Sequence, residues 1–194
     1  MRPDCIPATI HRTINAIVLH CSATPSGQWL GGKRPGQPGY RTAPSIIDEW
    51  HKARGFRRTE AMRNAFNWAL PSIGYHWVID IDGRIWTGRN PEEPGAHVAG
   101  HNAYTLGICL VGGVEREARY TPAQWASAAE LVQGLRTLLG TRTAVVGHRD
   151  YSPDTDRDGV VEPREWLKTC PGFDVRSWVA AGLQPAAAHV VVPA

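Results

Sequence analysis

Short apolar runs alternate along the chain with longer amphipathic stretches, a pattern that indicates both strands and helices. The apolar runs predict buried strands at residues 14–20, 74–80, 84–87, 105–111 and 144–147. The amphipathic stretches predict helices at residues 45–55, 121–139 and 174–181, with a helical or irregular piece at 59–70. With a hairpin signal at Asp82-Gly83, we expect an α/β fold, a single domain with a mixed central β-sheet flanked by helices.

Local signals set the ends of these elements. Thr121 and Gln124 form a capping box at the start of the long helix. Ser45 is the expected cap of the first helix, which Gly55 would end. Residues 25–44 hold several Gly and Pro but few apolar residues, which indicates a long surface loop of the sort that often borders a site.

The chain of 194 residues is long enough for one well-cored domain and short for two. We expect this domain to span residues 14–182, after a loosely held lead-in at 1–13 and before a flexible tail at 183–194. The lead-in lacks the apolar core of a secretory signal, and no apolar run is long enough to span a bilayer. We therefore expect the protein to stay in the cytoplasm after synthesis and not to insert into a membrane.

The net charge and the cysteines indicate which partners and which state of the thiols to expect. The formal net charge is +3, but the basic residues are scattered and form no nucleic-acid motif, so we expect no nucleic-acid partner. A cytosolic setting favours free thiols over disulfides for the four cysteines. Strand alternation directs Cys21 away from the face of His20, which predicts a buried structural thiol.

Three residues of the types that zinc prefers stand near strand ends or in a loop. His20 and His148 each close an apolar strand, and Cys170 lies two places after Lys168. Two imidazoles and a thiolate would leave a fourth tetrahedral position open, as catalytic zinc sites do. Lys168 can steady an oxyanion there, and Tyr75 can offer a phenol. A lone histidine or buried cysteine is more often structural, so spacing alone leaves both interpretations open.

A family resemblance decides between them. Seven blocks resemble, in family order, the type-2 N-acetylmuramoyl-L-alanine amidases, which include phage lysozymes of amidase type and the peptidoglycan recognition proteins. The blocks are IVLHCSAT (17–24), EWHKARGF (49–56), GYHWVIDIDGRIWTGR (74–89), GAHVAGHNAYTLGICLVGG (95–113), YTPAQ (120–124), GHRD (147–150) and KTCPGFD (168–174). Together they cover most of residues 14–180, and the combined pattern is highly specific.

The resemblance implies the amidase and peptidoglycan-recognition-protein fold, with zinc on His20, His148 and Cys170. It also implies that Tyr75 and Lys168 are the catalytic pair. The implied reaction is hydrolysis of the amide between the lactyl group of N-acetylmuramic acid and L-alanine of the stem peptide. The metal would activate water, and Lys168 would hold the oxyanion with it, while Tyr75 would orient the water or help move its proton.

The resemblance places a loop beside the substrate cleft, and the expected substrate contacts on it are His97, His101 and Asn102. Glu92 and Glu93 lie in a Pro-flanked part of the same loop and are expected to be solvated. This argues against a glycosidase with paired carboxylates.

The segment between the second and third zinc ligands departs from the shortest phage lysozymes. It fits the twelve-residue calcium-loop pattern over 154–165. The expected calcium ligands are Asp154, Asp156, Asp158, the carbonyl of Val160, and Glu165. Pro153 forbids a long incoming helix, so a complete EF-hand is excluded. The alternative is a solvated acidic insertion with fortuitous spacing.

The expected biological role is that of a phage endolysin that degrades the peptidoglycan of its host. With no signal sequence, it would need a holin-like partner to reach the wall. We expect a monomer that acts on the cell wall after release. Two alternatives remain: a bacterial muropeptide-recycling or wall-remodelling amidase, and a non-catalytic peptidoglycan-binding protein. Retention of both Tyr75 and Cys170 argues against the second.

Overall fold

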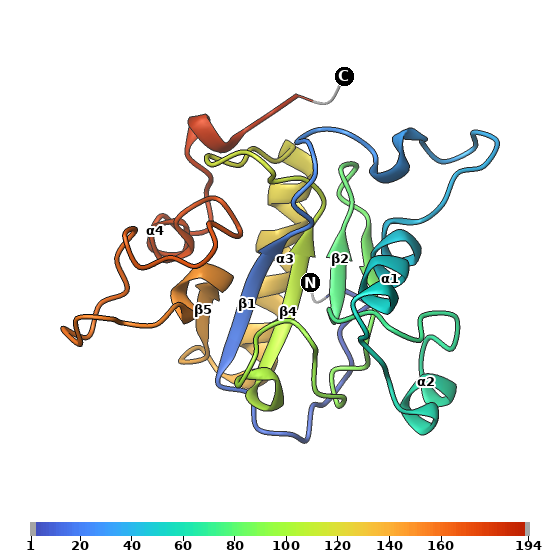
Figure 1. The fold of residues 1–194 in the computed structure, drawn as a ribbon, viewed down its shortest axis with the longest axis horizontal. Coiled ribbons are helices and arrows are strands. Elements are labelled where there is room, and N and C mark those ends of the chain that lie inside the picture. Colours follow the sequence, from blue (N-terminus) through green and yellow to red (C-terminus); the bar gives the residue numbers. More distant parts are fainter. Residues whose placement is uncertain (1–2, 193–194) are drawn as a thin grey trace.

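The computed structural model describes residues 3–192, in which five strands form one sheet (Figure 1). The strand order is β3-β2-β4-β1-β5. The strands are β1 (Ala16–Cys21), β2 (Trp77–Ile79), β3 (Ile85–Thr87), β4 (Thr105–Leu110) and β5 (Ala144–Gly147). Only β3 is antiparallel to its neighbour, so the mixed sheet and the hairpin are confirmed.

Helices cover both faces of this sheet. The α-helices are α1 (Ala43–Ala53), α2 (Glu60–Ala65), α3 (Pro122–Leu139) and α4 (Val175–Ala180). Short 3-10 turns are η1 (Leu30–Gly32), η2 (Asn102–Tyr104), η3 (His148–Tyr151) and η4 (Ala187–His189). Helix α3 crosses behind the sheet in Figure 1, and α4 lies beside β5. Within residues 3–192, no helix is long and apolar enough to cross a membrane.

Strand alternation divides the core into two clusters. Ile17 and Leu19 of β1 join the cluster that contains the α3 residue Leu131. The other face carries a smaller cluster that contains Ile47 of α1. Because His20 follows Leu19, its side chain faces the α1 side of the sheet. His20 therefore lies on the face with the smaller core.

Helix ends agree with the predictions in one case and differ in another. The capping box of Thr121 and Gln124 is present at the start of α3. Helix α1, in contrast, begins at Ala43 with Thr42 at its N-cap, so the prediction of Ser45 as the cap was wrong. Pro44 lies in the first turn, where its fixed φ suits a helix start and its missing N–H costs nothing.

The lead-in at 1–13 is not loosely held in its described part, which corrects the prediction. Ile6 is 3% exposed and belongs to the main core. The Arg12 guanidinium donates to the carbonyls of Ala103 and Thr105, both at 2.9 Å. These contacts tie the lead-in to the start of β4.

The C-terminal tail also packs against the domain. Leu183 is buried, and the carbonyl of His189 accepts hydrogen bonds from the backbone N–H of Tyr120 and the indole N–H of Trp125. Parts of the predicted flexible tail therefore have partners on the core, from Leu183 to Val191, which the prediction did not include. The last two residues lie outside the described part of the chain.

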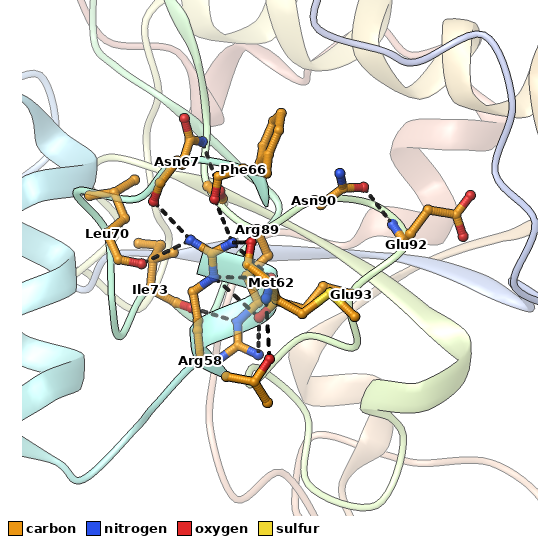
Figure 2. A network of polar contacts seen from close by, with 12 residues as sticks. Arg58, Met62, Phe66, Asn67, Leu70, Ile73, Arg89, Asn90, Glu92 and Glu93 are labelled. Atoms are coloured by element: carbon orange, nitrogen blue, oxygen red, sulfur yellow. Dashed lines mark hydrogen bonds and ion pairs between the residues drawn. The ribbon is translucent and has the colours of Figure 1, made fainter. Parts of the chain in front are cut away.

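A buried ion network, drawn in Figure 2, corrects the prediction that Glu93 is solvated. Glu93 is 3% exposed and lies 2.9 Å from the Arg58 guanidinium and 3.1 Å from that of Arg89. The Arg58 side chain also donates to four carbonyls of the segment around α2: Met62, Phe66, Asn67 and Leu70. Glu93 thus joins the α2 segment to the loop that carries His97.

Candidate metal centre and active site

The three predicted metal ligands converge. Strands β1 and β5 are parallel neighbours, with Leu19 paired to Gly147, so the residues that follow each of these emerge side by side. His20 Nδ1 lies 3.1 Å from His148 Nδ1 and 3.9 Å from Cys170 Sγ. Their three ligand atoms lie within 4.8 Å of one another, close enough to hold a metal ion.

The spacing of these atoms fits zinc. Tetrahedral bonds of about 2.0 Å to nitrogen and about 2.3 Å to sulfur place ligand atoms about 3.3 Å (N to N) and about 3.5 Å (N to S) apart. The observed separations of 3.1 and 3.9 Å are close to those values. The donor set of two nitrogens and one sulfur is also one that zinc accepts.

Electrostatics around His20, His148 and Cys170 suit metal binding. Burial lowers the pKa of His148 to about 4 and the pKa of His20 well below its ordinary value, so both rings are neutral. A hydrogen bond with Cys21 and burial together raise the pKa of Cys170 well above its ordinary value. A metal ion at this position would replace the thiol proton. The backbone N–H of Cys21 donates to Cys170 Sγ at 3.2 Å and would stabilise the thiolate.

Tyr75 and Lys168 line the same cavity as these ligands. The Tyr75 ring lies 5.1 Å from the His20 ring, and burial raises the pKa of its phenol well above the ordinary value. Lys168 is exposed, and its positive charge is a secondary cause, after burial, of the lowered pKa of His148. A neutral phenol and a cation therefore meet beside the candidate metal centre.

The cavity has a volume of about 300 Å³ and reaches from the ligands to helix α1. Trp50 of α1 and Arg54, the C-cap residue of this helix four positions later, line this wall of the cavity. Trp50 is 41% exposed, whereas Ile46 and Ile47 of the same helix are buried. The Arg54 guanidinium lies over the Phe56 ring, 5.0 Å from its centroid. Helical spacing alone could not separate this wall from the core face, because the two are adjacent.

The three residues predicted to contact the substrate differ in their surroundings. His97 lines the cavity, but it is buried and its Nδ1 lies 3.0 Å from His20 Nε2. Burial lowers the pKa of His97 to about 3, so this ring is also neutral. Asn102 Oδ1 accepts hydrogen bonds from the backbone N–H groups of His97 and Val98. The exposed His101 ring lies 4.4 Å from that of Tyr151. Substrate contact by these residues stays a prediction.

The acidic loop extends away from the sheet beyond β5, in orange in Figure 1. Carboxylate oxygens of Asp154, Asp156 and Asp158 lie within 4.8 Å of one another. Gly159 has φ 88° and its N–H donates to Asp154, as the sharp turn of a calcium loop requires. Glu165, in contrast, accepts from Thr155 and from the N–H of Glu162.

Two of the predicted calcium ligands, Val160 and Asp156, also make other contacts within the loop. Val160 is 52% exposed, and its N–H donates to Asp158. Asp156 forms an ion pair with Arg164. Calcium binding by this loop stays a prediction.

Known proteins resemble this chain over most of its length. A family model described as N-acetylmuramoyl-L-alanine amidase matches residues 11–173. An uncharacterized protein of Haemophilus influenzae is 50% identical over 103 residues, which cover 51% of this chain and 88% of that protein. The endolysin of Escherichia phage T7 is 31% identical over 170 residues, which cover 84% of each chain.

A solved structure agrees with the family match. The N-acetylmuramoyl-L-alanine amidase LysC from Clostridium intestinale has a TM-score of 0.59 at 26% identity, over 89% of this chain and 86% of that one. The matched region contains the converging His20, His148 and Cys170. The chain therefore belongs to the type-2 N-acetylmuramoyl-L-alanine amidase family and is an enzyme of that activity.

Proposed function

We propose that this enzyme is a zinc-dependent amidase that cuts peptidoglycan between the lactyl group of N-acetylmuramic acid and L-alanine, and that it serves a phage as an endolysin. The convergence of His20, His148 and Cys170 beside Tyr75 and Lys168 carries this proposal. The likeness to the phage T7 endolysin over most of both chains supports the biological role.

The residues of the site divide the chemistry among them. His20, His148 and Cys170 would hold zinc and leave one position open; bound there, zinc polarises a carbonyl and lowers the pKa of water. The Lys168 ammonium stabilises the negative charge that develops on the carbonyl oxygen. Tyr75 keeps its proton because burial raises the pKa of its phenol, so it can orient water or donate to the leaving amine.

The substrate is a polymer in the wall, so an endolysin made in the cytoplasm needs a holin-like partner to reach it. The cavity is partly open to solvent and has residues of α1 in its lining, which leaves room for part of a glycan or peptide. A recycling or remodelling amidase would use the same residues on soluble muropeptides. A non-catalytic binder would have no use for the cation and phenol beside the ligand group.

One experiment tests the metal and the reaction together: zinc content measured beside stem-peptide release from intact sacculi. We expect about one zinc per wild-type chain and chelator-sensitive release. Cys170→Ser and His148→Ala should lose both. Cys5→Ser is the matched control, because Cys5 packs against the core cluster on the α3 side of the sheet.

The outcomes separate the alternatives. Release of peptides from soluble muropeptides but not from sacculi would support the recycling or remodelling role. Zinc and wall binding without any release would support the binder. If Cys170→Ser retained stoichiometric zinc and activity, the ligand assignment would be wrong.

A further inference from the structure

We infer that His97 is a positioning residue: it accepts the Nε2–H of His20 and so holds the bare Nδ1 of His20 toward His148 and Cys170. This inference rests on the proposed zinc function, and it assigns His97 a role other than substrate contact. It concerns which ring nitrogen of His20 carries the proton, a choice that decides whether the ring can bind a metal in that orientation.

A chain of hydrogen bonds from Thr105 through His97 to His20 determines which nitrogen of each ring carries the proton. The Thr105 hydroxyl lies 2.9 Å from the carbonyl of His101, which can only accept, so the single hydroxyl proton is used there. Thr105 Oγ1 also lies 3.4 Å from His97 Nε2. Since the oxygen has no proton left to donate, His97 Nε2 carries the proton of this contact.

The position of the proton on His97 in turn determines the position of the proton on His20. A neutral imidazole has one N–H, so with its proton on Nε2 the His97 ring offers a bare Nδ1. This Nδ1 lies 3.0 Å from His20 Nε2, which must therefore be the donor. His20 Nδ1 is left bare, and it is the atom that lies 3.1 Å from His148 Nδ1. Metal-bound histidines in proteins are commonly oriented by such a partner on the second nitrogen.

The fold provides a slot for the His97 ring. Gly107 interrupts the apolar strand β4, and a Cβ there would lie 2.7 Å from His97 Cγ. A Cβ on Gly95 would lie 2.3 Å from His97 Cδ2. Any other residue at these positions would collide with the ring, so two glycines permit its close approach to the strand. Asn102 fixes the backbone of His97 by accepting its N–H at 2.8 Å.

Burial favours orientation over substrate binding as the role of this ring. His97 is 9% exposed and His20 is 1% exposed, so their hydrogen bond is shielded from water. Both nitrogens of His97 already have partners within the protein. A substrate hydrogen bond to either nitrogen would have to break the chain of contacts that starts at Thr105.

Zinc affinity of three variants tests the inference. His97→Phe fills the slot without an acceptor, and His97→Asn restores a side-chain oxygen near the position of Nδ1. We expect competition with a chromophoric chelator to show about 10- to 100-fold weaker zinc binding for His97→Phe. His97→Asn should recover most of that loss. His101→Phe, the same change on the exposed loop, should bind zinc as the wild type does.

A measurement on the unmutated, zinc-loaded protein gives a second readout. Long-range ¹H–¹⁵N spectra should show the His20 proton on Nε2 and the His97 proton also on Nε2. A proton on His20 Nδ1, or on His97 Nδ1, would overturn the inference even if every variant failed to fold.

The failures of the two proposals are distinguishable. A wild-type protein that binds no zinc contradicts the proposed function itself. Normal zinc affinity in folded His97→Phe, with zinc present in the wild type, contradicts only the positioning role of His97.

Discussion

Lys168 and Tyr75 bring a cation and a neutral phenol to the same cavity, and their contributions can be separated by mutation. We predict that Lys168→Met binds zinc normally but loses about 10²- to 10³-fold in kcat, the usual effect of removing one group that stabilises an oxyanion. KM should change little, because the charge it opposes develops in the transition state. Stem-peptide release kinetics with zinc analysis on the same samples provide the measurement.

The matched control for Lys168→Met is Lys168→Arg, which keeps a positive charge at the same position. It should retain more activity than the methionine variant, although the guanidinium is bulkier and planar. Unchanged turnover in Lys168→Met would remove the residue from the mechanism. A loss of bound zinc would instead show that Lys168 supports the ligand group.

At the scale of single residues, the convergence of the metal ligands His20 and His148 could be predicted from the sequence. The contact between His20 and His97 could not. His20 and His148 close apolar runs, and carboxyl ends of parallel strands meet at one edge, so convergence could be expected. The pairing of His20 with His97 joins residues 77 positions apart in the sequence. The glycines that admit the ring belong to a loop and a strand whose contact follows only from the tertiary structure.

Among the elements, the acidic loop at 154–165 is the one for which we predict calcium binding. Three carboxylates of this loop lie together, and like charges at that distance repel each other unless a cation intervenes. We predict that calcium at about 100 times its Kd stabilises the wild type by about 2.7 kcal/mol, a Tm increase of about 5–10 °C. Asp156→Asn should abolish most of this increase. Thermal unfolding with calcium or with chelator measures it.

Glu60→Gln serves as the control, since Glu60 is an exposed carboxylate in the first turn of α2, outside the loop. It should keep the full calcium response. An equal response of the wild type and Asp156→Asn would mean that the loop is a solvated insertion. In that case Arg164, which already pairs with Asp156, would offset part of the negative charge of the loop.

Sequence patterns predicted the presence of the strands and helices better than the ends of the helices or the packing of the terminal segments. The central strands and helix α3 follow from strong periodicity and from the Thr121 capping box, which are local signals. The start of α1 differs because Pro44 can begin a helix before Ser45 does. Both terminal segments pack on the domain through contacts with distant partners, such as His189 with Trp125, which no local pattern contains.

The Arg58–Glu93–Arg89 network acts at the scale of the whole molecule, because it joins two segments that no strand connects (Figure 2). Arg58 holds the segment around α2 by its carbonyls, and Glu93 stands four residues before His97. A charged residue in a Pro-flanked loop is usually solvated, so the sequence indicated the wrong environment for Glu93. Its burial depends on two arginines that reach it from different segments.

We predict that Glu93→Gln destabilises the protein by about 3–5 kcal/mol, because two buried guanidinium groups lose their shared carboxylate. Glu49→Gln is the matched control: it breaks a surface ion pair with Arg41, whose partners are 63% and 45% exposed, and should cost less than about 1 kcal/mol. Urea unfolding of both variants gives the comparison. Hydrogen exchange should further show amides near Arg58 and near His97 becoming labile together in Glu93→Gln. Similar costs for the two variants, or exchange confined to one segment, would contradict the view that this network fastens the α2 segment to the loop of the metal centre.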